Sequence, residues 1–85
     1  MKKSAPRITL YSTRNCGYCR QAKAFLQKNK LPFVEFDVER NRRAFTEFQR
    51  AGGRGVPLIV IGRKALNGFQ PKQLEKALRD AGFNV

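Results

Sequence analysis

Residues 7–19 read RITLYSTRNCGYC, and this stretch places two thiols where a predicted strand passes into a predicted helix. Its first part, residues 7–11, is rich in β-branched and aromatic side chains, which favour a strand. Cys16 and Cys19 are three positions apart, so on a helix they lie one turn apart on the same face. The N-terminus of a helix favours a thiolate through its dipole and its unpaired backbone N–H groups. The stretch therefore predicts thiol–disulfide chemistry.

A zinc site and a purely structural disulfide fit the CxxC pattern less well. The chain has two cysteines and no histidine, whereas structural zinc takes four protein ligands, so a zinc site would need a second subunit. A structural disulfide between Cys16 and Cys19 would close a very short loop, and the entropic gain from a cross-link grows with loop length. A CxxC beside a βαβ pattern is instead typical of thioredoxin-like redox proteins.

The length and composition indicate one globular domain. With 85 residues, 41% of them hydrophobic, the chain can bury a modest core. We assign residues 7–85 to the domain and residues 1–6 to a flexible N-terminal arm. The chain has no run of about 18 apolar residues, and no apolar stretch follows the N-terminal lysines as it would in a secretory signal. We therefore expect a reducing, cytoplasmic location, where a CxxC pair is more often catalytic than structural.

The net charge of +12 is large for this length and attracts anionic partners. Positive charge is densest in residues 40–54, which carry five arginines and a single acid, Glu47. Such a segment can be a solvated helix face, a docking surface for an acidic protein or a nucleic-acid surface. A nucleic-acid-binding module is the weakest of these three, because most phenylalanines fall at core spacing and leave few stacking platforms.

Periodicity and chain breakers predict the element order βαβαββα. The predicted strands are residues 7–11, 33–38, 57–61 and 64–66, and the predicted helices are residues 16–30, 40–51 and 71–81. A helix between the first two strands makes them parallel, and a short turn makes the last two antiparallel. The predicted fold class is therefore α/β, with a four-stranded mixed sheet and three helices.

The same periodicity predicts which side chains form the core. In the second strand, Val34, Phe36 and Val38 alternate with two acids and share one face. The strand at residues 57–61 is almost wholly apolar, which is typical of a central strand covered on both faces. The predicted core face of the helix at residues 40–51 consists of Ala44, Phe45 and Phe48.

In its order of elements and in three local motifs, the chain resembles the glutaredoxins. The motifs are Cys16-Gly17-Tyr18-Cys19, Gly55-Val56-Pro57 and the turn that contains Gly68 before the last helix. The resemblance spans about residues 7–81 and implies a thioredoxin-like fold. It also implies a cis peptide bond before Pro57, close to the dithiol, and a Val56 backbone that pairs with the peptide part of the substrate.

The sequence departs from the family pattern at three places. Gly17 replaces the proline of the common CPYC motif, and glycine makes the helix start more permissive. Thr13, followed by Arg14, stands where family members often carry a lysine. The turn at residues 67–71 reads NGFQP and lacks the family's aspartate. This turn resembles that of glutaredoxin-like redoxins that serve ribonucleotide reductase, are recharged by thioredoxin reductase and lack a good glutathione site.

Cys16 is the predicted nucleophile, because it lies nearer the helix N-terminus and is expected to be the more exposed thiol. Arg14 and Arg20 add positive charge, and we expect the pKa of Cys16 to lie below the usual value of about 8.5. Cys19 is expected to resolve the mixed disulfide. Tyr18 either packs over the pair, lines the substrate groove or is a solvent-facing spacer.

We expect glutathione to act as the reductant, although with weak saturation. Its carboxylates can be met by Lys23, by Arg54 and by the exposed N–H groups at the start of the last helix, but no acid is present for its ammonium group. A plain surface lysine is an equally good interpretation of Lys23. The residues implied in substrate or glutathione binding are Arg14, Tyr18, Lys23, Arg54, Val56, Pro57, Gly68, Phe69 and Gln70.

The expected partners are disulfide-containing proteins, acidic ones among them, with glutathione or thioredoxin reductase as electron donor. We expect a monomer with no metal ion, no membrane contact and no nucleic-acid partner. Some glutaredoxins hold an iron–sulfur cluster between two subunits through the first cysteine and glutathione. For this chain a cluster is an alternative that only a dimer would allow.

Overall fold

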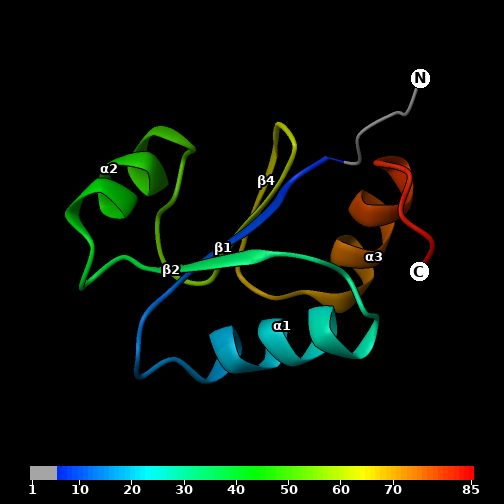
Figure 1. Ribbon diagram of the computed structural model, residues 1–85, viewed down its shortest axis with the longest axis horizontal. Coiled ribbons are helices and arrows are strands. Elements are labelled where there is room, and N and C mark those ends of the chain that lie inside the picture. The colour runs from blue at the N-terminus through cyan, green and yellow to red at the C-terminus, as the bar shows by residue number, and fades with distance from the viewer. Residues whose placement is uncertain (1–5) are drawn as a thin grey trace.

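The computed structural model describes residues 6–85 and shows a four-stranded sheet with helices on both faces (Figure 1). The elements are β1 (Ile8–Ser12), α1 (Gly17–Lys28), β2 (Val34–Asp37), α2 (Arg42–Arg50), β3 (Leu58–Ile61), β4 (Lys64–Asn67) and α3 (Pro71–Asp80). The strand order is β2-β1-β3-β4, with β1 and β2 parallel and the other two pairs antiparallel. The predicted fold class, element order and strand directions are thus confirmed. Apart from Pro6, the predicted arm lies outside the described residues.

Two helix ends differ from the prediction for reasons of hydrogen bonding. The helix predicted from residue 40 begins at Arg42, because Asn41 caps it: the Asn41 Oδ1 accepts a hydrogen bond from the Ala44 N–H at 3.0 Å. The first helix ends at Lys28 rather than near residue 30, since Lys30 adopts a positive φ of 56° and leaves helical geometry. At these two ends, a cap hydrogen bond and a positive φ, and not the spacing of apolar residues, decide where the helix begins or ends.

β1 runs one residue further toward the first helix than predicted. Ser12 pairs with Asp37 of β2, and the Val38 N–H donates to the Ser12 carbonyl at 2.9 Å. The other strands begin and end within one residue of the predicted bounds. Phe36 and Val38 pack on the predicted common face, whereas Val34 is 42% exposed.

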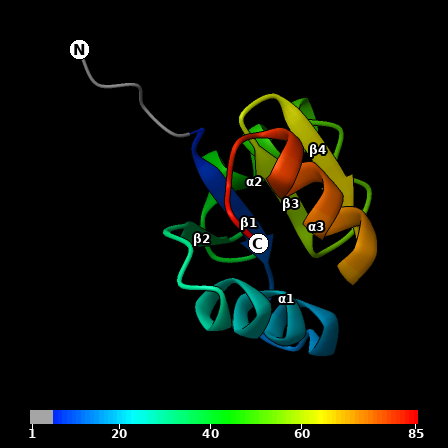
Figure 2. The same cartoon turned by 90° about the vertical axis from the view of Figure 1, so that its right-hand side faces the viewer.

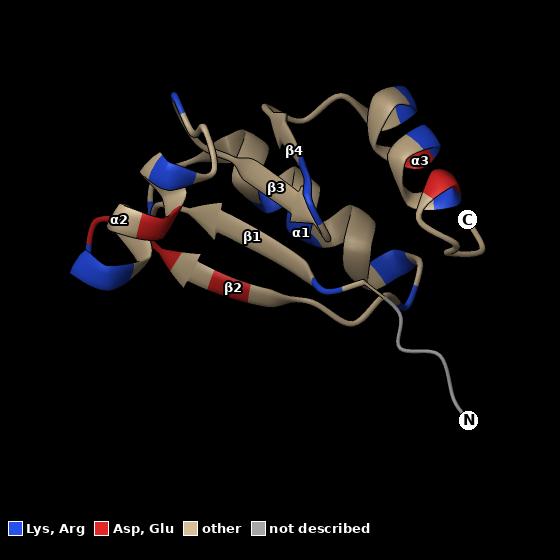
Figure 3. Ribbon diagram, turned by 90° about the horizontal axis from the view of Figure 1, so that it is seen from above, with Lys and Arg blue, Asp and Glu red and all other residues tan. Residues whose placement is uncertain are grey.

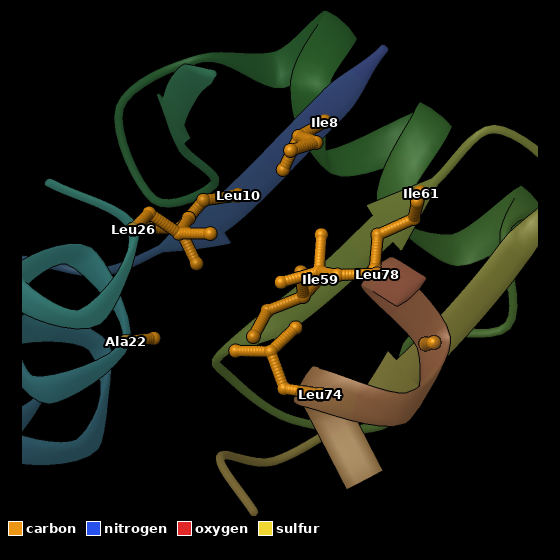
Figure 4. Packing of buried hydrophobic residues seen from close by; sticks show 9 residues of the cluster. Ile8, Leu10, Ala22, Leu26, Ile59, Ile61, Leu74 and Leu78 are labelled. Carbon is orange, nitrogen blue, oxygen red and sulfur yellow. The ribbon is translucent and has the colours of Figure 1, made fainter. Parts of the chain in front are cut away.

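α1 and α3 cover one face of the sheet with mainly branched aliphatic side chains (Figures 1 and 2). The buried residues of this cluster are Ile8, Leu10, Ala22, Leu26, Ile59, Ile61, Leu74, Ala77 and Leu78. Figure 4 shows the labelled side chains of α1 pointing toward β1 and those of α3 pointing toward β3. Burying one such large side chain is worth about 1.5–3 kcal/mol. Because α1 also carries a cysteine on its buried face, this cluster fixes the dithiol relative to the sheet.

α2 covers the opposite face with a smaller and more aromatic cluster. Its buried residues are Tyr11, Val38, Ala44, Phe48 and Leu58. The prediction that Phe45 belongs to the core is wrong: it is 41% exposed and stacks on Phe48, with ring centroids 6.0 Å apart. Ala44 and Phe48 lie one turn apart and face the sheet, which turns Phe45 outward. Burial raises the pKa of Tyr11 above its ordinary value, and the Glu47 carboxylate raises it further.

Charged residues are spread over the molecule. Figure 3 shows Lys and Arg on all three helices, and acidic residues on β2, α2 and α3. Between residues 6 and 85 the ion pairs are Lys23–Glu35, Glu75–Arg79 and Lys76–Asp80, so most cations of this part have no acidic partner. In the same range no helix has the length and apolar character to cross a membrane, and no three His, Cys, Asp or Glu side chains gather as a metal site requires.

Candidate active site

Cys16 occupies the N-cap position of α1, directly before the first helical residue. Its backbone is extended, and its Sγ accepts a hydrogen bond from the Cys19 N–H at 3.1 Å. The two cysteines form a disulfide with their Cα atoms 5.2 Å apart. The Cys16 sulfur thus lies where the helix dipole and a backbone N–H stabilise negative charge. The predicted place of the dithiol, between the first strand and the first helix, is confirmed.

The two sulfurs differ in their access to solvent. Cys16 is half-buried, whereas Cys19 is 3% exposed and lies on the buried face of α1. The expected difference in exposure is therefore confirmed. The first attack on a large substrate needs an accessible sulfur, and the second attack is intramolecular. The arrangement suits Cys16 for the first step and Cys19 for the second.

The two arginines predicted to assist Cys16 lie near the dithiol. Arg14 and Arg20 are exposed, and the Arg20 Nη1 lies 3.5 Å from the Arg14 carbonyl, the limit of a hydrogen bond. Both residues line a cavity that Cys19 also lines. Their positive charge favours the thiolate form of a neighbouring cysteine.

Sequence reasoning missed a polar cluster in this cavity, which measures about 400 Å³. The Ser12 Oγ donates a hydrogen bond to Glu35 Oε2 at 2.8 Å, and the Lys23 Nζ lies 3.0 Å from Glu35 Oε1. Lys23, which was expected to meet a glutathione carboxylate, is therefore ion-paired within the protein. The sequence offers only a weak signal for this cluster, an acid on the face of the second strand opposite its apolar residues.

The Val56–Pro57 peptide bond is cis, as the family resemblance implied. Tyr11 pairs with Leu58, so this bond lies at the end of the sheet from which the chain enters α1. Pro57 is buried, Val56 is half-buried, and the Pro57 carbonyl accepts a hydrogen bond from the Gly68 N–H at 2.8 Å. Gly68 has a φ of 87°, which suits glycine. The turn before α3 is thus tied to the entry of β3.

Asn67 joins the same two segments through its side chain, a contact that the sequence did not reveal. Its Oδ1 accepts a hydrogen bond from the Arg54 N–H at 3.0 Å, and its Nδ2 donates to the Gly52 carbonyl at 3.3 Å. The Arg54 side chain is exposed. Asn67 therefore holds the backbone that leads to Val56 and leaves the Arg54 guanidinium accessible.

The remaining predicted site residues differ in their accessibility. Tyr18 is 63% exposed, which fits a groove-lining or solvent-facing side chain and not one packed over the disulfide. Phe69 packs edge-on against Phe25 of α1, with ring centroids 6.0 Å apart. Gln70 is exposed at the N-cap of α3 and makes no side-chain cap hydrogen bond. Tyr18 and Gln70 are thus free to contact a bound molecule, whereas Phe69 supports the core.

The fold and the dithiol define a class, that of thioredoxin-fold proteins with a CxxC pair at the start of a helix. A family model described as glutaredoxin matches residues 8–66, well over half of the chain. The chain therefore belongs to the glutaredoxin family.

Relatives and solved structures narrow this assignment. The glutaredoxin-like protein NrdH of Lactococcus lactis is 29% identical over 69 residues, which cover 81% of this chain and 96% of the relative. The NrdH-redoxin structure from Escherichia coli is 26% identical with a TM-score of 0.74, over 82% of this chain and 92% of its own. The thioredoxin-like protein BC3987 is 28% identical with a TM-score of 0.79, over 82% and 97%. Together with the site geometry, the family assignment makes the chain a glutaredoxin-like thiol–disulfide oxidoreductase that is similar to the NrdH redoxins, with Cys16 and Cys19 as its CxxC pair.

Proposed function

We propose that this redoxin reduces protein disulfides by a dithiol mechanism in which Cys16 attacks and Cys19 resolves. The observation that carries the proposal is the hydrogen bond from the Cys19 N–H to the Cys16 Sγ at the start of α1. This bond supports negative charge on the sulfur that a protein substrate can reach, because Cys19 is buried and Cys16 is not.

The mechanism has two exchange steps. The Cys16 thiolate attacks one sulfur of the substrate disulfide, which forms a mixed disulfide and releases the other substrate sulfur as a thiolate. Cys19 then loses its proton and attacks the Cys16 sulfur, and the second substrate sulfur leaves with the bonding electrons. The substrate gains two electrons and two protons, and the redoxin is left with the Cys16–Cys19 disulfide seen in the structure.

We infer that an enzyme of the thioredoxin reductase type is the better electron donor and that glutathione is the weaker one. Lys23 is engaged by Glu35, and Gln70 offers no charge to the glutathione ammonium group. A lost charge-assisted hydrogen bond costs about 1.5–3 kcal/mol, roughly ten- to a hundredfold in affinity. The E. coli NrdH-redoxin, a structural neighbour, has a thioredoxin-like activity profile. This neighbour and the Lys23 pair support a thioredoxin reductase as the donor in place of glutathione, the donor that the sequence analysis favoured.

The resemblance to the NrdH redoxins also supports a proposal for the target and the setting. We propose ribonucleotide reductase as one protein substrate and the cytoplasm as the location, since the reduced dithiol needs a reducing compartment. We propose that the redoxin acts as a monomer, without a resident metal ion.

Trapping with two cysteine variants tests the roles of the sulfurs. With a peptide disulfide as substrate, Cys19→Ser should stop at a covalent mixed disulfide that mass spectrometry detects. Cys16→Ser should form no adduct and show no turnover. An adduct on the Cys16→Ser variant would reverse the two roles.

A reductant panel tests the electron donor. Turnover is measured against glutathione concentration, beside an assay with thioredoxin reductase and NADPH, and we expect fast reduction only in the second. Gln70→Asp should lower the half-saturating glutathione concentration about tenfold, whereas Gln70→Asn adds no charge and serves as the control. Tight saturation of the unmodified protein by glutathione, without turnover by thioredoxin reductase, would overturn the inference.

A further inference from the structure

The cavity next to Cys19 contains a carboxylate that the two-cysteine mechanism does not use. Glu35 of β2 lines this cavity together with Cys19. Ser12, which is 3% exposed, holds one carboxylate oxygen at 2.8 Å, and Lys23 holds the other at 3.0 Å. Lys23 belongs to α1 and follows Cys19 by one helical turn. The Glu35 carboxylate is therefore fixed against α1, at the cavity that the resolving cysteine also lines.

The resolving step needs a proton acceptor at this place. Cys19 is 3% exposed, so bulk water reaches its sulfur poorly. The thiolate is the attacking form, and a thiol in buried surroundings gives up its proton reluctantly. We propose that Glu35 accepts the proton of Cys19 during resolution, an inference that rests on the dithiol mechanism proposed above. The cavity, of about 400 Å³, has room for water molecules that relay the proton.

The proton and electron balance closes within one turnover. As the Cys19 sulfur attacks the Cys16 sulfur, its proton passes to the Glu35 carboxylate, directly or through water. The bond between Cys16 and the substrate sulfur breaks, and the substrate sulfur leaves with the electron pair. The protonated Glu35 then gives its proton to that thiolate or to solvent, which regenerates the carboxylate. The step needs no further oxidant or reductant.

The other charged groups at the cavity select Glu35 as the acceptor. Arg14 of the loop before α1 and Arg20 of α1 line the cavity, and as cations they cannot accept a proton. Asp37 also lines the cavity, but its Oδ1 accepts the Glu39 N–H at 2.9 Å in the turn after β2. Glu35, in contrast, is held toward α1 by Lys23. Asp37 therefore offers a matched control, a second carboxylate at the same cavity.

Single-turnover kinetics separate the two exchange steps. In a Cys19→Ser background, formation of the mixed disulfide reports the attack by Cys16 alone, and adding Glu35→Gln should leave this rate unchanged. With both cysteines present, Glu35→Gln should slow conversion of the mixed disulfide to the Cys16–Cys19 disulfide about a hundredfold near neutral pH, the lower end of what a positioned base contributes. The difference in resolution rate between Glu35→Gln and the unmodified protein should shrink as the pH rises, because hydroxide then removes the Cys19 proton.

Three further variants guard against a merely structural effect. Asp37→Asn should leave both rates unchanged, and Glu35→Asp, which retains a carboxylate, should restore most of the pH profile. Ser12→Ala removes one contact that holds Glu35, so resolution should slow while attack by Cys16 does not. Urea unfolding of each variant verifies that it is folded.

The outcomes separate this inference from the mechanism beneath it. Three results would overturn the role of Glu35. The first is an unchanged rate of resolution in Glu35→Gln and Ser12→Ala, and the second is an equal slowing of attack and resolution. The third is a loss of resolution rate in Glu35→Gln that is the same at every pH. Failure of the single Cys19→Ser variant to form any mixed disulfide would instead refute the dithiol mechanism.

Discussion

The starts of α1 and α2 share one backbone geometry and differ in the atom that caps the helix. Cys16 has φ −138° and ψ 105°, and Asn41 has φ −134° and ψ 106°. Each side chain accepts a hydrogen bond from the N–H three residues later, at 3.1 Å from Cys19 to sulfur and at 3.0 Å from Ala44 to oxygen. Asn41 is an ordinary stabilising cap, whereas Cys16 places a reactive sulfur in the same position. The chain thus supports its nucleophile with an ordinary helix start.

α3 supplies a third case. Gln70 precedes it with φ −126° and ψ 103° but makes no side-chain cap hydrogen bond, and Pro71 opens the helix. The three helices therefore begin with the same backbone geometry. The N-cap acceptor is a sulfur in α1 and an amide oxygen in α2, and α3 has no side-chain acceptor. Changes at these three starts separate what a cap contributes to stability from what the sulfur contributes to chemistry.

Among the changes at the three helix starts, the largest effect on the free energy of unfolding is expected at the start of α2. Asn41→Ala removes the acceptor of the Ala44 N–H, and loss of such a cap costs about 1 kcal/mol, with a range of roughly 0.5–2. Urea unfolding measures the loss, and Asn41→Asp, which keeps a cap oxygen, is the control. Redox turnover should not change, because α2 lies on the other face of the sheet from α1. Equal stability of the alanine and aspartate variants would contradict the prediction.

The order of the elements could be predicted because its signals are local. Apolar periods mark the strands and helices, and Pro32, Gly52 and Gly82 mark where helices stop. The start of α2 is harder to predict, because the cap at Asn41 stands among arginines that continue the helical pattern on both sides. The exposure of Phe45 depends on how α2 is rotated against the sheet, which its short apolar pattern does not define.

The site was predictable where its residues are adjacent in sequence and hidden where they are not. The dithiol and the Val56–Pro57 bond are contiguous motifs. The contacts of Glu35 with Ser12 and Lys23 join three elements, and they depend on strand register and on the placement of α1. The two hydrogen bonds of the Asn67 side chain likewise join the end of β4 to the loop after α2. No single stretch of sequence encodes either cluster.

A cap added to α3 should give the second largest effect on the free energy of unfolding. Gln70→Asp places a carboxylate oxygen at a position with N-cap backbone geometry, next to the positive end of the helix dipole. We expect the free energy of unfolding to rise by about 1 kcal/mol. Gln70→Ala, which adds no acceptor, should leave it nearly unchanged. An aspartate variant no more stable than the alanine variant would show that the backbone geometry alone does not make a cap.

A better acceptor at Cys16 should stabilise the reduced protein and abolish its activity. A thiol is a weak hydrogen-bond acceptor, whereas asparagine is among the strongest N-cap residues. Cys16→Asn should therefore raise the free energy of unfolding above that of the reduced unmodified protein by roughly 0.5–1 kcal/mol. Urea unfolding under reducing conditions, at an acidic pH that keeps Cys16 as the thiol and not as the thiolate that a helix N-terminus favours, measures the difference, with Cys16→Ala as the reference that has no cap. If the asparagine variant is the less stable protein, the sulfur is the better partner for the Cys19 N–H.

The smallest effect is expected at Gly17, the first residue of α1 and the counterpart of Pro71 in α3. Proline suits this position because the N–H there has no partner within the helix and the fixed φ is already helical. A Cβ at Gly17 would meet no heavy atom within 4 Å, and Cys16 has the extended backbone that a following proline favours. Gly17→Pro should therefore stabilise the fold by about 0.4–1 kcal/mol, because proline lowers the conformational entropy of the unfolded chain.

Because that gain comes from the unfolded chain, the oxidised and the reduced protein should show it alike. Urea unfolding of both forms measures it, and Gly17→Ala is the control that removes glycine without restraining φ as proline does. A loss of stability in both forms would mean that proline does not fit the α1 start. A loss confined to the reduced form would mean that the Gly17 N–H helps to hold the Cys16 sulfur once the disulfide is broken. In that case the starts of α1 and α3 are alike in backbone only, and the glycine of this CxxC motif serves the chemistry of the thiol.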